Sequence, residues 1–298
     1  MANAKNILTF DIEEWFHILD SLDSIHPDKW NSLESRIEGN MEIIFRILQE
    51  NNMKATFFVV GWIADKYPHL VKKISALGFE IGSHSDQHQI IWHQNKREFE
   101  NDLISSISKL EQLSGKAITM YRAPGFSLVP SVSWAFDILA KSGIKVDSSV
   151  SSTCYGYNDG STFTSLTKPA KIITDNAVIK ELPMSSFSMF GNKVAYAGGG
   201  WFRLIPSLVL ERLFANSDYS LSYFHPREFD KNHPAINDLP LLRKLLCYYG
   251  VKNCEQKLIY ILKKYQFTDI TDAVNTIDWN SCPQINLTNK QVSAQLAY

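Results

Sequence analysis

The sequence predicts an α/β fold in which helices pack outside a mostly parallel sheet. Two observations lead to this prediction. Short apolar runs rich in β-branched and aromatic residues recur along the 298-residue chain. Between them lie segments of roughly 10 to 20 residues whose apolar positions follow a helical period. Strands that alternate with helices in this way favour a parallel sheet covered by helices.

Each predicted strand is a short run of aliphatic, β-branched or aromatic residues. Residues 55–60, ATFFVV, are the clearest example, because such side chains pack well on a buried pleated surface. Residues 148–200 are rich in Ser, Thr, Gly and Asn, so we expect loops and irregular strands there. The predicted strands are residues 7–10, 55–60, 79–83, 119–123, 144–147 and 221–224.

The predicted helices combine apolar residues at helical spacing with recognisable ends. Asn40 is the expected N-cap of the first helix. Pro68 is expected to divide one helix into two pieces, because proline lacks the amide hydrogen that a helix interior requires. A glycine directly after three of the helices suits the C′ position. The predicted helices are residues 41–49, 62–77, 96–114, 131–142, 206–214, 239–248 and 253–265.

The composition is that of an ordinary globular protein. Hydrophobic residues make up 45% of the chain, charged residues 20%, and the formal net charge is -1. No Lys/Arg run stands out, so we expect no nucleic-acid partner. No apolar run reaches the ~20 residues that span a bilayer, and the N-terminus lacks a signal-peptide pattern. We therefore expect a cytoplasmic protein without an integral membrane segment, whose four cysteines are reduced thiols.

Three acidic residues, Asp11, Glu13 and Glu14, stand directly after the first predicted strand. The carboxyl ends of parallel strands usually carry the active site of an α/β protein. The same acids could instead favour the start of a following helix through its dipole. The pattern alone leaves both interpretations open.

Other polar residues follow other predicted strands. His84 and His88 are four residues apart, which can bring two imidazoles to one metal ion. Two histidines and one carboxylate are a usual ligand set for hydrolytic zinc. Arg122 could keep a neighbouring carboxylate ionised, and His225 is placed to act as a general acid. A surface arginine before a turn and a structural histidine are the alternatives for these last two.

In this order, the motifs resemble the NodB-homology polysaccharide deacetylases, carbohydrate esterase family four. A finer pattern, with DIEEWF, GGGWFR and HPREFD, resembles the subgroup found with exopolysaccharide and O-antigen biosynthesis systems. The resemblance implies a distorted (β/α) barrel as catalytic domain over residues 1–230, with residues 231–298 as a helical extension packed on it. The matching segments are TFDIEE at 9–14, KATFFVVGWIA at 54–64, GFEIGSHSDQH at 78–88, YRAPGF at 121–126 and YFHP at 223–226.

The resemblance also implies roles for individual residues. Asp11 would be the catalytic base, Arg122 the residue that holds it, and His225 the catalytic acid. A divalent metal, with zinc expected, would be bound by Glu13, His84 and His88. The residues expected at the oxyanion or the substrate are Gly125, Phe126, Gly199, Gly200 and Trp201.

The chain departs from the family pattern at the first motif and at the turn after Arg122. Many members have two adjacent acids, but Ile12 follows Asp11 here. We therefore assign the third metal ligand to Glu13, which shares a strand face with Asp11, and expect Glu14 to point away. Gly125 stands where many members have Tyr, and its backbone N–H could still serve an oxyanion.

A further departure concerns the acid that orients His225. Val150 stands where members often carry an Asp for this purpose. Glu181 and Glu228 are the candidates to replace it, and the sequence leaves the choice open.

The aromatic residues near the glycines could form a sugar-binding wall. Trp201, Phe202, Trp134 and Phe126 are candidates, and each could be a core residue instead. Residues 198–200 are three glycines, which either let the backbone approach a ligand or form a flexible connection.

The resemblance implies hydrolysis of an N-acetyl group on an amino sugar, with release of acetate. In the cytoplasm, the expected substrate is a nucleotide-linked or lipid-linked glycan precursor. An O-acetyl sugar esterase and a catalytically silent carbohydrate-binding member of the fold are the alternatives. Neither the sugar nor the oligomeric state can be predicted from the sequence.

Overall fold

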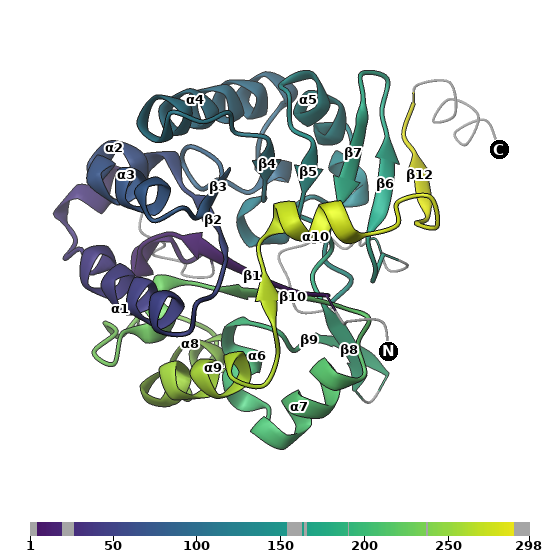
Figure 1. Ribbon diagram of the computed structural model, residues 1–298. Coiled ribbons are helices and arrows are strands. Elements are labelled where there is room, and N and C mark those ends of the chain that lie inside the picture. The colour runs from purple at the N-terminus through teal and green to yellow at the C-terminus, as the bar shows by residue number, and fades with distance from the viewer. Residues whose placement is uncertain are drawn as a thin grey trace.

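The computed structural model of the chain describes residues 5–19, 27–153, 163, 166–189, 191–236 and 238–288. Its centre is a ten-stranded sheet with the order β10-β1-β2-β3-β4-β5-β7-β6-β12, in which β11 also pairs with β1 (Figure 1). The strands are β1 (Lys5–Ile12), β2 (Thr56–Val59), β3 (Glu80–Ser83), β4 (Met120–Tyr121), β5 (Val146–Asp147), β6 (Ala170–Ile173), β7 (Val178–Glu181), β10 (Tyr219–Phe224), β11 (Phe267–Thr268) and β12 (Gln284–Asn286).

The sheet is mostly parallel, as predicted. In the described residues, only β6 and β7 pair antiparallel within it. The strand direction turns strongly from β1 and β10 to β6 and β7, so the sheet curls into a distorted barrel (Figure 1). The hairpin of β8 (Ser186–Met189) and β9 (Asn192–Ala195) lies outside this sheet and belongs to the middle region predicted as irregular.

Helices cover the outside of the barrel (Figure 1). The prediction for residues 96–114 is confirmed, because Asn95 caps the first turn and Gly115 ends the helix in the left-handed region, with φ 68°. The division at Pro68 is also confirmed. The helices are α1 (Ile37–Glu50), α2 (Gly61–Lys66), α3 (Pro68–Ala76), α4 (Lys96–Ser114), α5 (Ala135–Lys141), α6 (Gly199–Leu204), α7 (Ser207–Ala215), α8 (Leu241–Tyr248), α9 (Cys254–Leu262) and α10 (Ile270–Thr276).

The predicted start of the first helix is wrong. Helix α1 begins at Ile37, and Asn40 lies inside it rather than at its N-cap. The carboxylate of Glu14 accepts hydrogen bonds from the backbone N–H groups of Arg36 and Ile37 at 3.0 and 3.1 Å. A residue distant in sequence therefore satisfies the first free amides of the helix, which local capping signals cannot indicate.

The region predicted as one helix at residues 131–142 is a short 3-10 turn followed by α5. At the other end of the chain, α10, β11 and β12 were not predicted. Strand β12 pairs with β6, so part of the polar C-terminal segment is ordered.

The largest apolar core lies between the sheet and helices from both halves of the chain. Phe10 of β1 stacks against Phe57 of β2 with ring centroids 5.3 Å apart. Cys254 and Leu258 of α9 belong to the same buried cluster. The strands β1, β2, β3 and β10 are thus fixed side by side, and their carboxyl ends meet at one edge of the barrel.

No helix in the described part of the chain is long and apolar enough to cross a membrane. No disulfide joins Cys247, Cys254 and Cys282, and Cys154 lies outside the described residues.

Candidate active site

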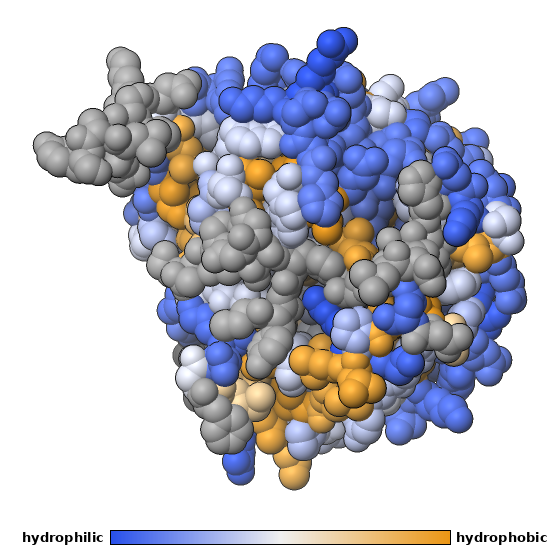
Figure 2. Space-filling view, turned by 180° about the vertical axis from the view of Figure 1, so that it is seen from behind, coloured by the Kyte–Doolittle hydropathy of each residue, from blue (hydrophilic) through white to orange (hydrophobic). Residues whose placement is uncertain are grey.

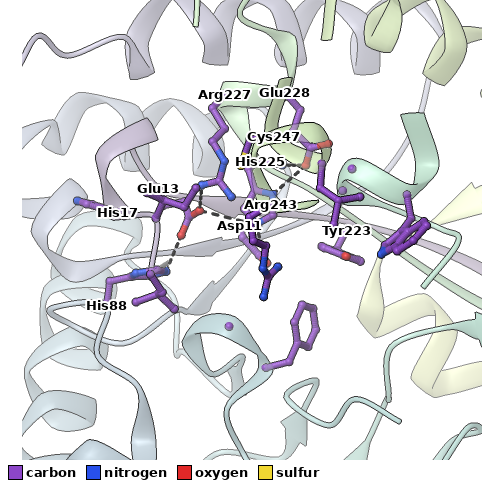
Figure 3. A pocket seen from close by; sticks show the side chains of 18 of the residues that line it. Asp11, Glu13, His17, His88, Tyr223, His225, Arg227, Glu228, Arg243 and Cys247 are labelled. Atoms are coloured by element: carbon purple, nitrogen blue, oxygen red, sulfur yellow. Dashed lines mark hydrogen bonds and ion pairs between the residues drawn. The ribbon is translucent and has the colours of Figure 1, made fainter. Parts of the chain in front are cut away.

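One pocket opens at the carboxyl ends of β1, β3, β4 and β10 (Figure 3). Asp11 and Glu13 come from β1 and its end, His84 from the residue after β3, and His225 from the residue after β10. Each side chain reaches the pocket because parallel strands place their carboxyl ends at the same edge.

Glu13, His84 and His88 form a compact set of buried side chains. Each offers a ligand atom, and these atoms lie within 4.8 Å of one another. His84 donates a hydrogen bond from Nδ1 to the carbonyl oxygen of Arg122 at 2.8 Å, which leaves its Nε2 for the pocket. His88 is held in a left-handed backbone conformation, with φ 51°.

The side chain of His88 shows that this set fits a divalent cation. Its Nε2 is buried and lies 2.5 Å from Oε2 of Glu13, so the imidazole and the carboxylate converge on one point. A metal ion at that point would bind the Nε2 and the carboxylate together. Two imidazoles and one carboxylate are ligands that zinc accepts.

The charges around the set suit metal binding. Burial alone would raise the pKa of Glu13, but His88 and Arg227 together hold it well below its usual range. Burial lowers the pKa of His84 to about 4, although Asp11 opposes this shift. Near neutral pH the set therefore presents an ionised carboxylate and a neutral imidazole, the forms that bind metals.

Asp11 is fixed by a buried arginine. Arg122 donates a hydrogen bond from Nη1 to Oδ1 of Asp11 at 2.7 Å, and its side chain is 0% exposed. The guanidinium also donates to Ser148 and lies 4.2 Å from the centre of the Phe58 ring. With its orientation fixed on one side, Asp11 places Oδ2 3.9 Å from Nε2 of His225.

His225 is oriented by Glu228, one of the two candidates that the sequence left open. Oε1 of Glu228 accepts hydrogen bonds from Nδ1 and from the backbone N–H of His225, at 2.8 and 3.1 Å. The other candidate, Glu181, accepts a hydrogen bond from the backbone N–H of Val150 and does not contact His225.

Arg203 of α6 holds Glu228 in turn. It pairs with the Glu228 carboxylate and donates to the backbone carbonyl oxygens of Leu246 and Tyr249. Burial alone would raise the pKa of Glu228, but Arg203 and His225 lower it. Glu228 therefore stays ionised beside the imidazole ring that it orients.

Comparisons with known proteins agree with this geometry. A family model described as polysaccharide deacetylase matches residues 8–145. This segment contains Asp11 and Arg122 as well as the Glu13, His84 and His88 set. Residues 148–275, which include His225, match a family described as a domain of unknown function.

Curated proteins that are similar in sequence to this chain are named as peptidoglycan deacetylases. A peptidoglycan-N-acetylglucosamine deacetylase of Bacillus cereus is 37% identical over 89 residues, which are 30% of this chain and 32% of that protein. A peptidoglycan deacetylase of Helicobacter pylori is 26% identical over 107 residues, 36% of either chain. The chain thus spans about a third of the length of these curated relatives.

Solved structures confirm the predicted fold class. A protein from Mycobacterium smegmatis, provisionally assigned as a polysaccharide deacetylase, matches 97% of this chain and 95% of its own with TM-score 0.63 and 17% identity. A CE4 family pseudoenzyme from Bacillus anthracis matches 96% of this chain and 70% of its own with TM-score 0.51 and 12% identity. At these identities the likeness concerns the fold alone.

The residues that the sequence predicted to face the substrate all line the pocket. Gly125 and Phe126 lie on the wall formed after β4, and both have positive φ, 62° and 55°. The ring of Phe126 packs edge-on against Tyr223 with centroids 5.1 Å apart. The remaining lining residues among those predicted are Gly199, Gly200 and Trp201.

The three glycines at residues 198–200 are required by close packing. A Cβ on Gly198 would overlap the backbone of Tyr223, and one on Gly200 would overlap the carbonyl oxygen of Leu246. The missing side chains let α6 pack directly on β10 and α8. This packing brings Arg203 within reach of Glu228, so the segment is a fixed part of the pocket rather than a flexible connection.

Two of the aromatic residues proposed for a sugar-facing wall pack in or against the apolar core instead. Phe202 is 1% exposed and packs edge-on against Phe224. Trp134 packs against Phe99, away from the pocket. The sequence alone does not show whether a large aromatic ring beside a run of glycines faces the pocket or the core.

Three functional candidates were not predicted. Arg203 holds Glu228, Arg227 pairs with Glu13, and Arg243 of α8 lines the pocket. Arg227 and Glu228 belong to the HPREFD motif, so their nearness to His225 in sequence was a usable signal. Arg203 and Arg243 come from helices, and no local sequence pattern indicates how these helices pack.

Proposed function

We propose that this protein is a metal-dependent hydrolase that removes an N-acetyl group from an amino sugar and releases acetate. One observation carries the proposal. The Glu13, His84 and His88 set, an arginine-held Asp11 and a glutamate-held His225 face the same pocket from different strand ends. The match of residues 8–145 to the polysaccharide deacetylase model and the names of the relatives support the same chemistry.

The metal would be held by Glu13, His84 and His88, and zinc suits these ligands. When bound, a divalent ion supplies Lewis acidity to the acetyl carbonyl and makes water a better nucleophile at neutral pH. Asp11 takes the proton from the attacking water, as a general base. Arg122 keeps the Asp11 carboxylate oriented, with one oxygen occupied and the other directed to the reacting atoms.

His225 would donate a proton from Nε2 to the departing amine nitrogen. An amide is a poor substrate without this proton, because the unprotonated nitrogen leaves slowly. Glu228 fixes the ring through Nδ1 and stabilises its positive charge, while Arg203 keeps Glu228 ionised. The two catalytic groups thus have separate tasks, with the base fixed by an arginine and the acid fixed by a carboxylate.

For the substrate, we propose a nucleotide-linked or lipid-linked glycan precursor of exopolysaccharide or O-antigen biosynthesis, processed in the cytoplasm. Support comes from the resemblance of the DIEEWF, GGGWFR and HPREFD motifs to that subgroup. Phe126 and Trp201, which line the pocket, would contact the sugar ring.

Acetate release tests the proposal. The zinc-loaded protein should release acetate from an N-acetylglucosamine oligosaccharide, and Asp11→Asn should lower the rate by roughly 10²–10⁴. Release only from an O-acetylated sugar would replace the proposal with an O-acetyl esterase. Release from neither, with retained sugar binding, would leave a catalytically silent carbohydrate-binding protein.

A further inference from the structure

The loop from His84 to His88 has a backbone conformation that its own residues do not favour. Ser85 and His88 both have positive φ, 67° and 51°, in the left-handed region that residues with a side chain rarely adopt. Such conformations persist only where surrounding contacts impose them. The imidazole rings of His84 and His88 have centroids 5.2 Å apart, and this separation depends on the path of the backbone between them.

Helix α4 supplies contacts to this segment through three polar residues. Asp102, Ser106 and Lys109 follow the i, i+4, i+7 spacing, so they lie in one row along the helix, which we call the polar row of α4. The outer face of α4 is mostly polar too, and the upper right of Figure 2, on the side of the molecule where the helix lies, is hydrophilic. The polar row faces inward instead. Oγ of Ser106, for example, lies 2.8 Å from Oγ of Ser83 at the end of β3, and both residues are fully buried.

The other two members of the polar row hold the loop itself. The two carboxylate oxygens of Asp102 accept hydrogen bonds from the backbone N–H groups of Asp86 and Gln87, at 2.8 and 3.0 Å. Nζ of Lys109 donates a hydrogen bond to Oδ1 of Asp86 at 2.8 Å. One carboxylate therefore fixes two consecutive peptide units between the two histidines.

Helix α2 holds the loop through its carbonyl groups. The backbone N–H groups of Gly61 and Trp62 donate hydrogen bonds to the carbonyl oxygens of Ser85 and Asp86, each at 2.9 Å. A side chain at Gly61 would prevent this approach, because an added Cβ would lie 2.0 Å from Oδ1 of Asp86. Because α2 acts through its backbone, the carboxylate of Asp102 is the support that a substitution can remove.

We propose that Asp102 is a positioning residue for the metal-binding set. Its carboxylate holds the loop so that His84 and His88 can bind one ion together with Glu13. The inference rests on the proposed metal site and extends it to a residue that does not line the pocket. Since Asp102 acts through the backbone of residues 86 and 87, its removal should weaken metal binding without removing a ligand.

The zinc affinity of the full chain, measured by competition with a chelating indicator, tests this assignment. Asp102→Asn keeps the size of the side chain but replaces one acceptor oxygen with an NH₂ group, which cannot accept a hydrogen bond from a backbone N–H. We expect the affinity to fall roughly 10–100-fold, and to fall further in Asp102→Ala. An Asp102→Asn variant that binds zinc as tightly as the wild type would overturn the proposal.

Glu111→Gln is the matched control on the same helix. Oε1 of Glu111 accepts a hydrogen bond from the backbone N–H of Ile118 at 3.0 Å. This contact lies before β4, whereas the pocket lies at the carboxyl ends of the strands. Both changes weaken a bond from a carboxylate to the backbone, so both should lower the urea midpoint of the metal-free protein. Only Asp102→Asn should lower the zinc affinity, and equal losses of affinity in the two variants would refute a positioning role.

Lys109→Met separates positioning from a simple effect of charge. If Asp102 acted on the ion only through its negative charge, the loss of the positive charge of Lys109 would strengthen zinc binding. If the contacts position the loop, Lys109→Met should instead lower the zinc affinity, because the Asp86 side chain, 9% exposed, loses the cation that holds it. A Lys109→Met variant that binds zinc more tightly than the wild type would contradict the proposal.

The wild-type measurement separates this proposal from the proposed function. A wild-type chain that binds no divalent metal would refute the metal site, and the role of Asp102 with it. A wild-type chain that binds zinc, with an Asp102→Asn variant of equal affinity, would refute the role of Asp102 alone.

Discussion

The carboxylate of Glu228 accepts a hydrogen bond from Nδ1 of His225 at 2.8 Å, and both side chains belong to one short turn after β10. A residue three positions after the proposed acid therefore orients its ring. Proteins that the motifs resemble often carry an aspartate for this purpose, and Val150 stands at that place here.

Replacing Glu228 tests its assignment. Glu228→Gln keeps the size of the side chain but removes the negative charge that accepts the hydrogen bond from Nδ1 of His225. We expect kcat to fall roughly 10–100-fold, with metal content unchanged. The fall should be larger for an N-acetyl than for an O-acetyl substrate, because an amine leaving group needs the proton more.

Glu181→Gln is the matched control for that change. Burial and the neighbouring Asp147 raise the pKa of Glu181 well above its usual range, so glutamine mimics its neutral form. The fall in kcat should therefore be confined to Glu228→Gln and be absent from Glu181→Gln. A Glu228→Gln variant as active as Glu181→Gln would remove Glu228 from the mechanism.

The buried pair of Arg203 and Glu228 should be strongly needed for stability. Arg203→Met leaves an ionised carboxylate buried without its cation, which costs roughly 3–5 kcal/mol in the free energy of unfolding. Lys54→Met breaks a pair with Asp272 in which the lysine is 63% exposed, and should change the free energy of unfolding far less. Urea unfolding measures the free energy of unfolding of both variants. Equal losses in the two variants would contradict the special need for the buried pair.

Any side chain at position 200 is expected to destabilise the protein. A Cβ there would overlap the carbonyl oxygen of Leu246, so Gly200→Ala should force α6 and α8 apart and destabilise the protein by roughly 1–3 kcal/mol. Gly39→Ala on α1 is the control, because nothing lies within 4 Å of its added Cβ. That change should stabilise the protein by roughly 0.5–1 kcal/mol through helix propensity. Thermal unfolding that ranks the two variants in the opposite order would refute the packing argument.

His233 gives the folded protein a pH dependence. Burial lowers its pKa to about 4, although the carbonyl oxygen of Pro234 opposes the shift. The unfolded chain takes up the proton near its ordinary pKa of about 6.5, whereas the folded chain takes it up only near 4. The contribution of His233 to stability is therefore complete above that ordinary pKa and is lost as the pH falls toward 4.

The size of this effect is on the order of 3 kcal/mol, from 1.36 kcal/mol for each unit of pKa. His233→Asn should flatten the decline in unfolding free energy between about pH 6.5 and about pH 4. His93→Asn, at an exposed histidine, should leave the decline unchanged. Equal pH profiles for wild type and His233→Asn, measured by urea unfolding, would disprove the assignment.

The elements of the fold that depend on local signals were predictable. Helix α4 has its predicted bounds because Asn95 and Gly115 define its ends within the same segment. The start of α1 was not predictable from its own residues, because Glu14 satisfies its first amides from a distant loop. Strand β11 consists of two residues that pair with β1, too few to give a periodic pattern.

The same distinction holds for the pocket. The side chains that end strands stood out in the sequence, since the carboxyl ends of parallel strands gather at one edge. Glu228 was one of two candidates, and it lies three residues after His225. Arg203 was not, since its partner is 25 residues away in sequence and meets it only after α6 packs on α8.

Metal content of the purified protein tests the central proposal most directly. Elemental analysis after zinc loading and dialysis should find about one ion per chain in the wild type and almost none in a variant with His84→Ala and His88→Ala. His225→Ala should keep the ion, because that residue is assigned to proton transfer and not to metal binding. A wild-type chain that retains no divalent metal under these conditions would contradict the proposed metal-dependent hydrolysis.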